Sequence, residues 1–401
     1  MIFPKVDKEI AAFFFVTFFM GMSVSLMAPL IPVIKEDFNL SYTLASFVLT
    51  SFGVARMLLA LPSGYLYNHV NRKKLLLIGM GLMSVSSLIA GLSQSFAQFL
   101  IAQIIMGAGF SFCITTIIIS LSVSTESGNR GKVLGMNTFA RSAAAVVAPV
   151  MSGFIAITLG WRSVFLFYSF ITFVAILFIL FYIKKDYKKV REPVIRGNSK
   201  NNVRYMLFVL FLVSFLATFT TLGFKSTILP LYSRDVLHLE VAAISLVLSL
   251  MAVMHLITSP AAAILSDKYG RKSFLMFGLA TTVIGTFLFL FVSNMPMLIV
   301  AAIFLGLGTM IFVLPVTIMG DITPHAKAGK YYGIQRFATD LGFVVGPISL
   351  GYIVDIYGFT AATLVTILIS SVILILAAIF VHEPIKHEKI NWRRILQMEE
   401  D

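Results

Sequence analysis

The amino-acid sequence predicts an all-α membrane protein in which twelve transmembrane helices form two pseudo-symmetric six-helix halves. Three observations lead to this fold class: the composition, a succession of long apolar runs, and an internal repeat. Of the 401 residues, 58% are hydrophobic and only 12% are charged, whereas about a quarter of the residues in soluble domains are charged. Most of the chain is therefore expected to lie in lipid.

Apolar runs of spanning length follow one another along the chain. About 20 helical residues cross the ~30 Å hydrocarbon core. The first run, 10–34, carries no charge and is too long for the apolar region of a cleaved signal sequence. The runs 75–125 and 273–320 are also free of charge and are divided at SQSFAQ and SNMP. The predicted helices are 10–34, 42–67, 75–93, 98–123, 133–159, 163–183, 205–233, 241–266, 273–293, 297–320, 331–357 and 359–381.

Basic residues are distributed unevenly between the two sides of this arrangement. With both termini on one side, twenty-four lysines and arginines lie on that side, and only Lys35, Arg162 and Arg234 lie on the other. Because basic residues gather in cytoplasmic loops, both termini are expected in the cytoplasm, with the protein in the plasma (cytoplasmic) membrane. Topology thus accounts for the net charge of +13, and no nucleic-acid partner is expected.

An internal repeat divides the chain. Aligning Arg56 with His255 and Pro149 with Pro347 matches two separated segments at offsets of 199 and 198 residues, which predicts duplicated halves. The predicted units are an N-terminal half 1–183, a basic cytoplasmic linker 184–204, a C-terminal half 205–381 and a cytoplasmic tail 382–401. Parallel half-repeats with a binding site at their interface are a known plan of transporters.

Several motifs resemble those of the major facilitator superfamily. The family's Gly-x-Leu-x-Asp-x-x-Gly-Arg-Arg/Lys pattern after the second helix is matched in part by Gly64, Leu66, Asn68, Asn71, Arg72 and Lys73, and in the second half by Leu265, Asp267, Gly270, Arg271 and Lys272. The exporters' Gly-x-x-x-Gly-Pro-x-x-Gly-Gly pattern is matched in the fifth helix by Ala144, Ala148, Pro149, Ser152 and Gly153, and in the eleventh by Gly342, Gly346, Pro347 and Gly351. The fourth helix keeps Gly107 and Gly109 but has Gln103 and Met106 where the family has arginine and glutamine. The resemblance covers the whole chain, is closest to the twelve-helix drug and metabolite exporters, and implies alternating access.

Two cytoplasmic gating loops are predicted. Their residues are Gly64, Asn68, Arg72 and Lys73, and Asp267, Gly270, Arg271 and Lys272. An acid at a helix end can pair with basic groups and with the positive N-terminus of a neighbouring helix, and so hold the cytoplasmic side shut. In the alternative interpretation the basic residues only set topology. Asp267 carries a full charge whereas Asn68 offers neutral hydrogen bonds, which are about half as strong, so the predicted latch is asymmetric.

A second group of residues is assigned to helix packing and kinks rather than to substrate contact. It consists of Pro149, Gly153, Gly342, Gly346, Pro347 and Gly351. Small residues at four-residue spacing let helix backbones approach closely, and a proline in both halves suggests kinks or close crossings that rocking of the halves requires.

Ionisable residues inside the spans are the candidates for substrate binding or proton coupling, because charges in the membrane usually face a cavity or a partner. Arg56 and His255 occupy repeat-related positions near the middle of the membrane, and Arg336 precedes Asp340 by one helical turn, so these two side chains can pair. Lys225 is expected near the outer end of its helix, with its amine reaching the membrane surface. The candidates are Arg56, Gln103, Asn137, Arg141, His255, Gln335, Arg336 and Asp340.

Two interpretations stay open for the titratable candidates. Asp340, the one carboxylate deep in a span, is either a structural partner of Arg336 or Arg141 or a proton-binding switch whose partner changes as the halves rock. His255 either titrates against water or is a neutral, hydrogen-bonded side chain. Four cations against one anion leave a net charge of +3 in the spans, which favours an anionic or carboxylate-bearing substrate over a simple organic cation.

The leading functional hypothesis is a proton-coupled secondary transporter that exports a small organic compound. The alternatives are a facilitator or proton symporter of an organic anion, and a non-transporting membrane sensor or assembly protein. No catalytic pair, metal-ligand spacing or nucleotide-binding loop is found, so neither an enzyme nor a metal site is expected. The single cysteine, Cys113, is interpreted as an apolar filler. The expected partners are a small-molecule substrate and the lipid bilayer, the expected state is a monomer, and no cofactor other than the proton gradient is predicted.

Overall fold

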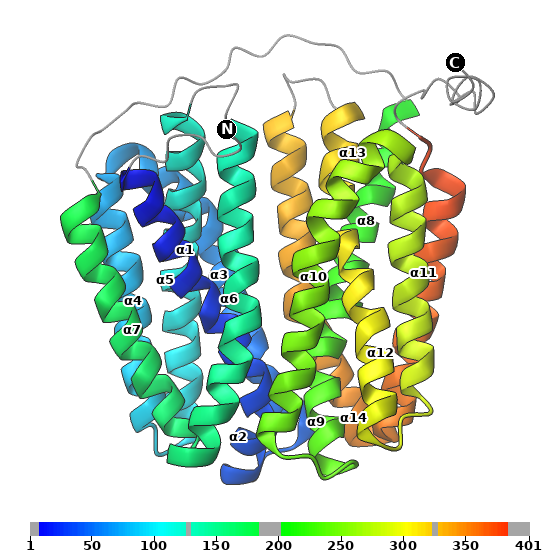
Figure 1. Ribbon diagram of the computed structural model, residues 1–401, viewed down its shortest axis with the longest axis horizontal. Helices are drawn as coiled ribbons and strands as arrows, with labels where there is room; N and C mark the ends of the chain where they lie inside the picture. Colours follow the sequence, from blue (N-terminus) through cyan, green and yellow to red (C-terminus); the bar gives the residue numbers. More distant parts are fainter. Residues whose placement is uncertain (1–7, 126–129, 184–201, 323–327, 384–401) are drawn as a thin grey trace, which may run out of the picture.

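The computed structural model describes residues 8–125, 130–183, 202–322 and 328–383, and within these ranges all regular secondary structure is helical. Figure 1 shows two bundles of long helices side by side, with α1 (Lys8–Met27) and α6 (Arg130–Leu159) in one bundle and α10 (Val241–Tyr269) and α11 (Arg271–Phe289) in the other. The other helices of the first bundle are α2 (Ile31–Asp37), α3 (Tyr42–His69), α4 (Arg72–Leu92), α5 (Phe96–Ser124) and α7 (Trp161–Tyr182). Those of the second are α8 (Asn202–Gly223), α9 (Leu229–Asp235), α12 (Met295–Gly308), α13 (Leu314–Ile322) and α14 (Ala328–Phe380).

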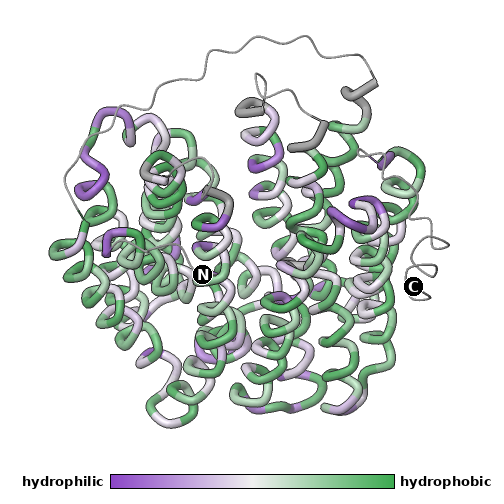
Figure 2. Tube along the Cα trace, turned by 45° about the horizontal axis from the view of Figure 1, so that its top comes forward, coloured by the Kyte–Doolittle hydropathy of each residue, from purple (hydrophilic) through white to green (hydrophobic). Residues whose placement is uncertain are grey.

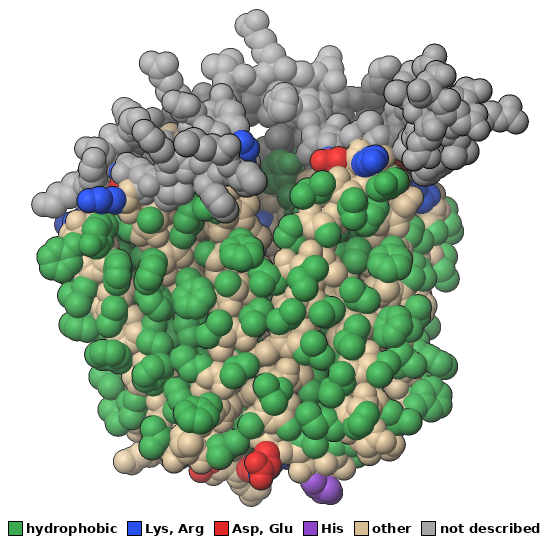
Figure 3. Space-filling model, in the orientation of Figure 1, with side chains coloured by type: hydrophobic (Ala, Val, Ile, Leu, Met, Phe, Trp, Pro, Cys, Tyr) green, Lys and Arg blue, Asp and Glu red, His purple; other side chains and the backbone are tan. Residues whose placement is uncertain are grey.

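The two ends of the molecule are distinguished by the chain ends. In Figure 1, α1 begins and α14 ends at the upper edge, called the terminal end below, and α2 and α9 lie at the lower edge, called the distal end. Figure 2 shows apolar residues along the helices and hydrophilic segments toward their ends. Figure 3 shows the same contrast on the surface, where hydrophobic side chains cover the face in view. An apolar surface of this extent is expected of a protein solvated by lipid.

Within the part of the chain that the structure describes, eleven helices are long and apolar enough to cross a membrane. The sequence predicts twelve because it divides the last stretch at residue 358. In the structure α14 runs as one element of 53 residues, and inside it Gly358 has a φ of 80° and a ψ of 174°, a conformation that breaks the helix. The eleven counted helices therefore include one that carries the two last predicted spans, and the twelve-span arrangement stays a proposal.

Three predicted helices are interrupted by irregular turns, which the sequence analysis did not predict. The first span changes to a 3₁₀ turn, η1 (Ala28–Leu30), and the seventh to a π-helical turn, η2 (Phe224–Ile228). The tenth contains a second 3₁₀ turn, η3 (Thr309–Phe312). Each turn is followed by a helix, α2, α9 or α13, that has a proline at its start. Proline cannot donate the backbone hydrogen bond that a continuous helix needs, which accounts for an interruption just before it.

The division at the two charge-free hairpins agrees with the structure. Helix α4 ends at Leu92 and α5 begins at Phe96, with the hydroxyl of Ser95 accepting from the amide of Gln98 at 3.4 Å. Helix α12 begins after Asn294, whose side-chain oxygen accepts from the amide of Met297 at 3.0 Å. A side-chain oxygen that satisfies a free amide at the first turn is a strong helix start.

The halves meet along two repeat-related helix pairs, α3 with α14 and α6 with α10. The hydroxyl of Thr50 donates to the carbonyl of Val344 across one pair, and that of Ser249 donates to the carbonyl of Val146 across the other, both at 2.9 Å. Thr50 and Ser249 are 199 residues apart, the offset of the repeat. The two interfaces therefore use the same backbone register in both halves.

Glycines at matching places let these helices approach. A Cβ added at Gly153 would lie 2.8 Å from that of Ser245, and one added at Gly351 would lie 2.8 Å from that of Ser46. Both distances are shorter than van der Waals contact, so a larger residue at either position would push the halves apart. This close packing is consistent with the structural role that the sequence predicted for these helices.

Candidate functional site

A cavity of about 450 Å³ lies between the two bundles, a size in the range of small-molecule sites. Its wall includes residues of η1, η2 and η3, the three irregular turns described above. Backbone that leaves the helical pattern at membrane depth is tolerated where it lines a cavity or is buried in protein. The three interruptions therefore have a location in common, the wall of this cavity.

Charged side chains of both halves converge on this cavity. Arg56 comes from α3, Arg141 from α6, Lys225 from η2, and Arg336 and Asp340 from α14. Four basic side chains thus share the wall with one carboxylate, which gives a net charge of +3. The charge balance counted along the sequence is concentrated at a single site, and it makes the cavity electropositive.

Asp340 is held by two arginines. Its side chain is only 3% exposed, and its Oδ1 accepts from Arg56 Nη2 at 2.5 Å while its Oδ2 accepts from Arg336 Nε at 2.9 Å. The sequence considered Arg336 or Arg141 as the partner; the structure has Arg336 together with Arg56. Because Arg56 belongs to the first half and Asp340 to the second, this ion pair ties the halves together at the cavity.

Aromatic rings surround the guanidinium of Arg56. Its central carbon lies 4.7 Å from the ring centroid of Phe343 and 5.9 Å from those of Phe52 and Phe110. Cation–π attraction and exclusion of water strengthen electrostatic contacts at such a place. The pair between Arg56 and Asp340 is therefore shielded from the solvent that weakens ion pairs at a protein surface.

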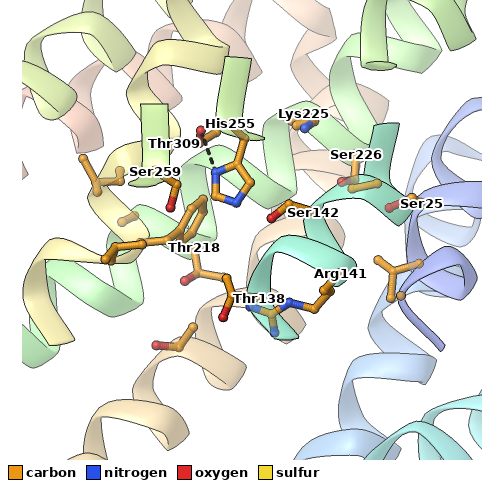
Figure 4. Close-up of a pocket in the computed structure, with 18 of the residues that line it drawn as sticks. Ser25, Thr138, Arg141, Ser142, Thr218, Lys225, Ser226, His255, Ser259 and Thr309 are labelled. Carbon is orange, nitrogen blue, oxygen red and sulfur yellow. Dashed lines mark hydrogen bonds between the residues drawn. The ribbon is translucent and has the colours of Figure 1, made fainter. Parts of the chain in front are cut away.

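His255 also faces the cavity (Figure 4). Its Nδ1 lies 3.0 Å from the hydroxyl of Thr309, and that hydroxyl donates its single hydrogen to the carbonyl of Gly306 at 2.6 Å. The Nδ1 atom must therefore be protonated, and it donates a hydrogen bond to the hydroxyl oxygen of Thr309. In neutral His255 this leaves Nε2 as an acceptor.

Lys225 lies elsewhere than the sequence suggested. It was expected near the outer end of its helix with its amine at the membrane surface, whereas it lines the cavity within the π-helical turn (Figure 4). The prediction assumed a continuous α-helix, whereas Lys225 lies inside a π-helical turn, an irregularity that is frequent at functional sites. The expectation was wrong for this residue.

Of the three amide side chains among the candidates, one lines the cavity and two do not. Gln335 lines the cavity, and its Nε2 lies 3.4 Å from the hydroxyl of Ser214. Asn137 and Gln103 do not line it: Asn137 accepts from the hydroxyl of Thr17 at 2.6 Å, and Gln103 is only 2% exposed. The structure thus brings together Arg56, Arg141, His255, Gln335, Arg336 and Asp340 and leaves these two buried among helices.

The predicted gating loops lie at the terminal end and make contacts within their own halves. Asp267 pairs with Arg271 at 2.7 Å and its side chain is 61% exposed, and Arg72 pairs with Glu9 at 2.7 Å. Asn68 is exposed. The loop ion pairs found among the described residues thus do not connect the halves. Figure 3 shows a recess between the halves at this end. The latch therefore stays a prediction for another conformation.

Ion pairs do connect the halves at the distal end. Lys35 pairs with Asp235 at 3.1 Å, and Arg234 Nε pairs with Glu36 at 2.7 Å. These two ion pairs, together with the contacts that Asp355 makes with Tyr42 and Thr43, are called the distal gate. Lys35 and Arg234 had been interpreted only as topology charges, although the acids beside them, Glu36 and Asp235, were a usable signal.

Asp355 completes the distal gate by capping a helix of the other half. Its carboxylate oxygens accept from the backbone amides of Tyr42 and Thr43, each at 2.8 Å, and from the hydroxyl of Thr43. These amides are two of the four at the start of α3 that have no partner within the helix. The cavity is thus closed by polar contacts at the distal end.

A charged central cavity and a pseudo-symmetric pair of bundles closed at one end are the features of a membrane transporter fold. A family profile described as Major Facilitator Superfamily matches residues 13–240 and 207–396. The chain belongs to this superfamily, whose members are transporters rather than enzymes. It is a multi-pass integral protein of the plasma membrane.

Relatives of similar length are known. The chain is 25% identical over 373 residues to the uncharacterized MFS-type transporter YceJ of Bacillus subtilis, covering 88% of this chain and 93% of that protein. It is 25% identical over 360 residues to the multidrug resistance protein MdtG of Proteus mirabilis, covering 86% and 88%. The crystal structure of a bacterial homolog of the human lysosomal transporter Spinster superposes with a TM-score of 0.79 at 13% identity, covering 92% of this chain and 96% of that one, which supports the fold.

Proposed function

We propose that this transporter exports a small organic compound in exchange for protons and works by alternating access. The proposal places the terminal end and both termini in the cytoplasm, with twelve spans in a monomer and the proton gradient as the only energy source. It is supported by the positive-inside asymmetry of the sequence and by the cavity between the halves. The name of the Proteus mirabilis relative, a multidrug resistance protein, supports the direction.

The observation that carries the proposal is the position of Asp340. Among the described residues it is the one carboxylate on the cavity wall, and it holds Arg56 across the interface between the halves. Protonation would remove the negative charge from this pair. Losing one partner of a buried ion pair costs about 3–5 kcal/mol, enough to change which conformation is favoured. Proton binding at Asp340 is therefore coupled to rocking of the halves.

Transport by purified protein in liposomes with an imposed pH gradient tests the proposal. The probes are ethidium, chloramphenicol and 4-phenylbutyrate, which are cationic, neutral and anionic, and proton movement is followed with an enclosed pH-sensitive dye. We expect substrate flux to accelerate when protons flow the opposite way. Asp340→Asn is expected to retain binding but to lose the acceleration by the gradient.

Asp37→Asn is the matched control, because Asp37 also pairs with an arginine, Arg162, but within one half and outside the cavity. This variant is expected to keep gradient-driven flux. If Asp340→Asn transports with the full dependence on the gradient, or if wild-type flux ignores the gradient, proton coupling through Asp340 is wrong.

A second candidate function follows from the charge of the cavity. The net charge of +3 favours anions, and a proton bound near an anion is held more tightly, which couples the two in the same direction. The protein would then be a facilitator or proton symporter of an organic anion. Flux of 4-phenylbutyrate that ignores the pH gradient indicates the facilitator, and flux in the direction of the protons indicates the symporter.

A further inference from the structure

We propose that Arg141 and Lys225, one from each half, are separate contact points for anionic groups on the cavity wall, so that the transported class is an organic anion with an apolar body. This inference rests on the proposed function only in that the cavity must admit substrate. Carboxylate, phosphonate and sulfonate groups share the required chemistry. The argument starts from which cations of the cavity already have partners.

Asp340 satisfies two of the four cations. Arg56 and Arg336 both bind its carboxylate, as described above. Arg141 and Lys225 have neither an ion pair nor a hydrogen bond with any residue that the structure describes, although both line the cavity. Basic side chains at membrane depth are normally paired because an unpaired charge is costly there. A ligand anion would supply the missing partner.

The two cations approach from opposite halves. Arg141 lies on α6 of the first bundle and Lys225 on η2 of the second. The cavity therefore presents one cation from each half to a bound substrate.

Hydroxyl groups beside the two cations are free to donate. Ser142 follows Arg141 and Ser226 follows Lys225, and both line the cavity without a hydrogen-bond partner among the described residues. Other hydroxyls of the wall are used within their helices: Thr218, for example, donates to the carbonyl of Ser214 at 2.8 Å. Cations combined with unoccupied hydroxyl donors form strong, charge-assisted contacts to an oxyanion.

Figure 4 shows the arrangement of these groups. The side chain of Ser142 points toward the ring of His255, which comes from α10, whereas Arg141 extends on the other side of the same turn of α6, and all of these residues line the cavity with Lys225 and Ser226. The neutral imidazole offers an acceptor at Nε2, as argued above, which suits a hydroxyl or amide of the substrate body. The remaining wall is largely apolar and includes Val24, Phe110, Leu248, Phe312 and Val316.

Modification of a cysteine on the cavity wall measures this preference without a known substrate. The site is Ala145→Cys, one helical turn after Arg141 and on the cavity, in a chain whose buried cysteine is replaced by Cys113→Ser. The purified protein in detergent is treated with the anionic 2-sulfonatoethyl or the cationic 2-(trimethylammonio)ethyl methanethiosulfonate. Both rates are divided by those of each reagent with a free small thiol.

The normalised anionic rate is expected to exceed the cationic rate. Removing one charge with Arg141→Gln or Lys225→Gln is expected to lower the ratio about tenfold, as expected for a unit charge within several ångströms. The control Lys74→Gln removes an exposed charge away from the cavity and is expected to leave the ratio unchanged. A ratio of one or less, a ratio insensitive to both cavity variants, or no modification at position 145 overturns the proposal.

Protection tests the ligand class. In the same protein, 4-phenylbutyrate is expected to slow modification by the uncharged methyl methanethiosulfonate at lower concentration than 4-phenylbutylamine does. Better protection by the amine, equal protection, or no protection by either compound overturns the assignment to anions. Because no gradient is present, failure here leaves proton-coupled export of another substrate class intact. Conversely, success here with gradient-independent flux in liposomes refutes only the proton coupling.

Discussion

Removal of the Asp355 carboxylate is expected to open the distal end. In Asp355→Ala the amides of Tyr42 and Thr43 lose their acceptors, both at 2.8 Å. Loss of a helix-capping side chain costs about 1 kcal/mol, and loss of a negative charge at a helix N-terminus about 0.3–1 kcal/mol more. Because Asp355 is exposed, the estimate is about 1–2 kcal/mol, a shift of roughly five- to thirtyfold toward the distally open conformation.

Labelling of a cysteine sealed inside the closed interface reports this equilibrium. Ser46 lies between α3 and α14, against Gly351, and is fully buried; Ser46→Cys in the Cys113→Ser background changes one oxygen to sulfur. When opening and closing are faster than labelling, the labelling rate follows the open population. We expect a rate about five- to thirtyfold higher with Asp355→Ala.

The control for this prediction is Asp37→Ala, which removes an acid from the same end of the molecule. Asp37 pairs with Arg162 at 2.8 Å, and both belong to the first half. This substitution should leave the distal gate intact and the labelling rate within about twofold of the parent. Equal acceleration by both substitutions, or none by Asp355→Ala, would show that the cap does not hold the halves together.

Three further predictions concern the gate, the packing and the latch. Lys35→Asp should raise the same labelling rate, because the new carboxylate faces that of Asp235. Adding Asp235→Lys should bring the labelling rate back to that of the parent. A coupling energy between the two substitutions below the ~0.2–1 kcal/mol typical of exposed pairs refutes the role of this ion pair. Gly107→Ala should lower the free energy of unfolding in detergent by about 1–3 kcal/mol, because the added Cβ would collide with a carbonyl oxygen of α3. Gly81→Ala meets no atom within 4 Å and should be neutral or stabilising. Asp267→Asn should increase the accessibility of a cysteine on the cavity wall from the terminal end. Unchanged accessibility would show that the charge of Asp267 has no role in the latch.

The helices were predictable because lipid imposes a simple rule of length and hydrophobicity on every span. The start of α3 at Tyr42 and of α10 at Val241, for example, coincides with the predicted 42 and 241. The interruptions at η1, η2 and η3 were not predicted, because apolar composition continues through them. Pro29, Pro32 and Pro230 were a local signal that was not used.

The candidate site was predicted in its composition but only in part in its pairing. Spacing along one helix placed Arg336 beside Asp340, as the structure has it at 2.9 Å. The contact with Arg56 depends on the approach of α3 to α14, which no local pattern encodes. Repeat-related alignment placed Arg56 opposite His255 in sequence but carried no information on which helices of the two halves face each other at the cavity.

The two gating loops share one contact. In the first copy Lys73 Nζ donates to the carbonyl of Leu180 at 2.6 Å, and in the second Lys272 Nζ donates to that of Ala378 at 2.7 Å. Each lysine thus fastens its loop to the last helical segment of its own half. These basic residues therefore have a structural role in addition to any effect on topology.

The capping of the following helix differs between the copies. At α4, the side chain of Asn71 accepts from the amide of Lys73 at 2.8 Å, whereas Gly270, with φ of 102°, has no side chain to cap α11. Glu383 fills that position from the end of α14, accepting from the amides of Arg271 and Lys272 at 2.9 and 3.0 Å. Because Glu383 supplies the helix cap, the carboxylate of Asp267 is left 61% exposed, and its ion-pair partner among the described residues is Arg271, at the start of α11 in the same half. This carboxylate is therefore available to the other half when the terminal end closes, an option that the neutral first copy lacks.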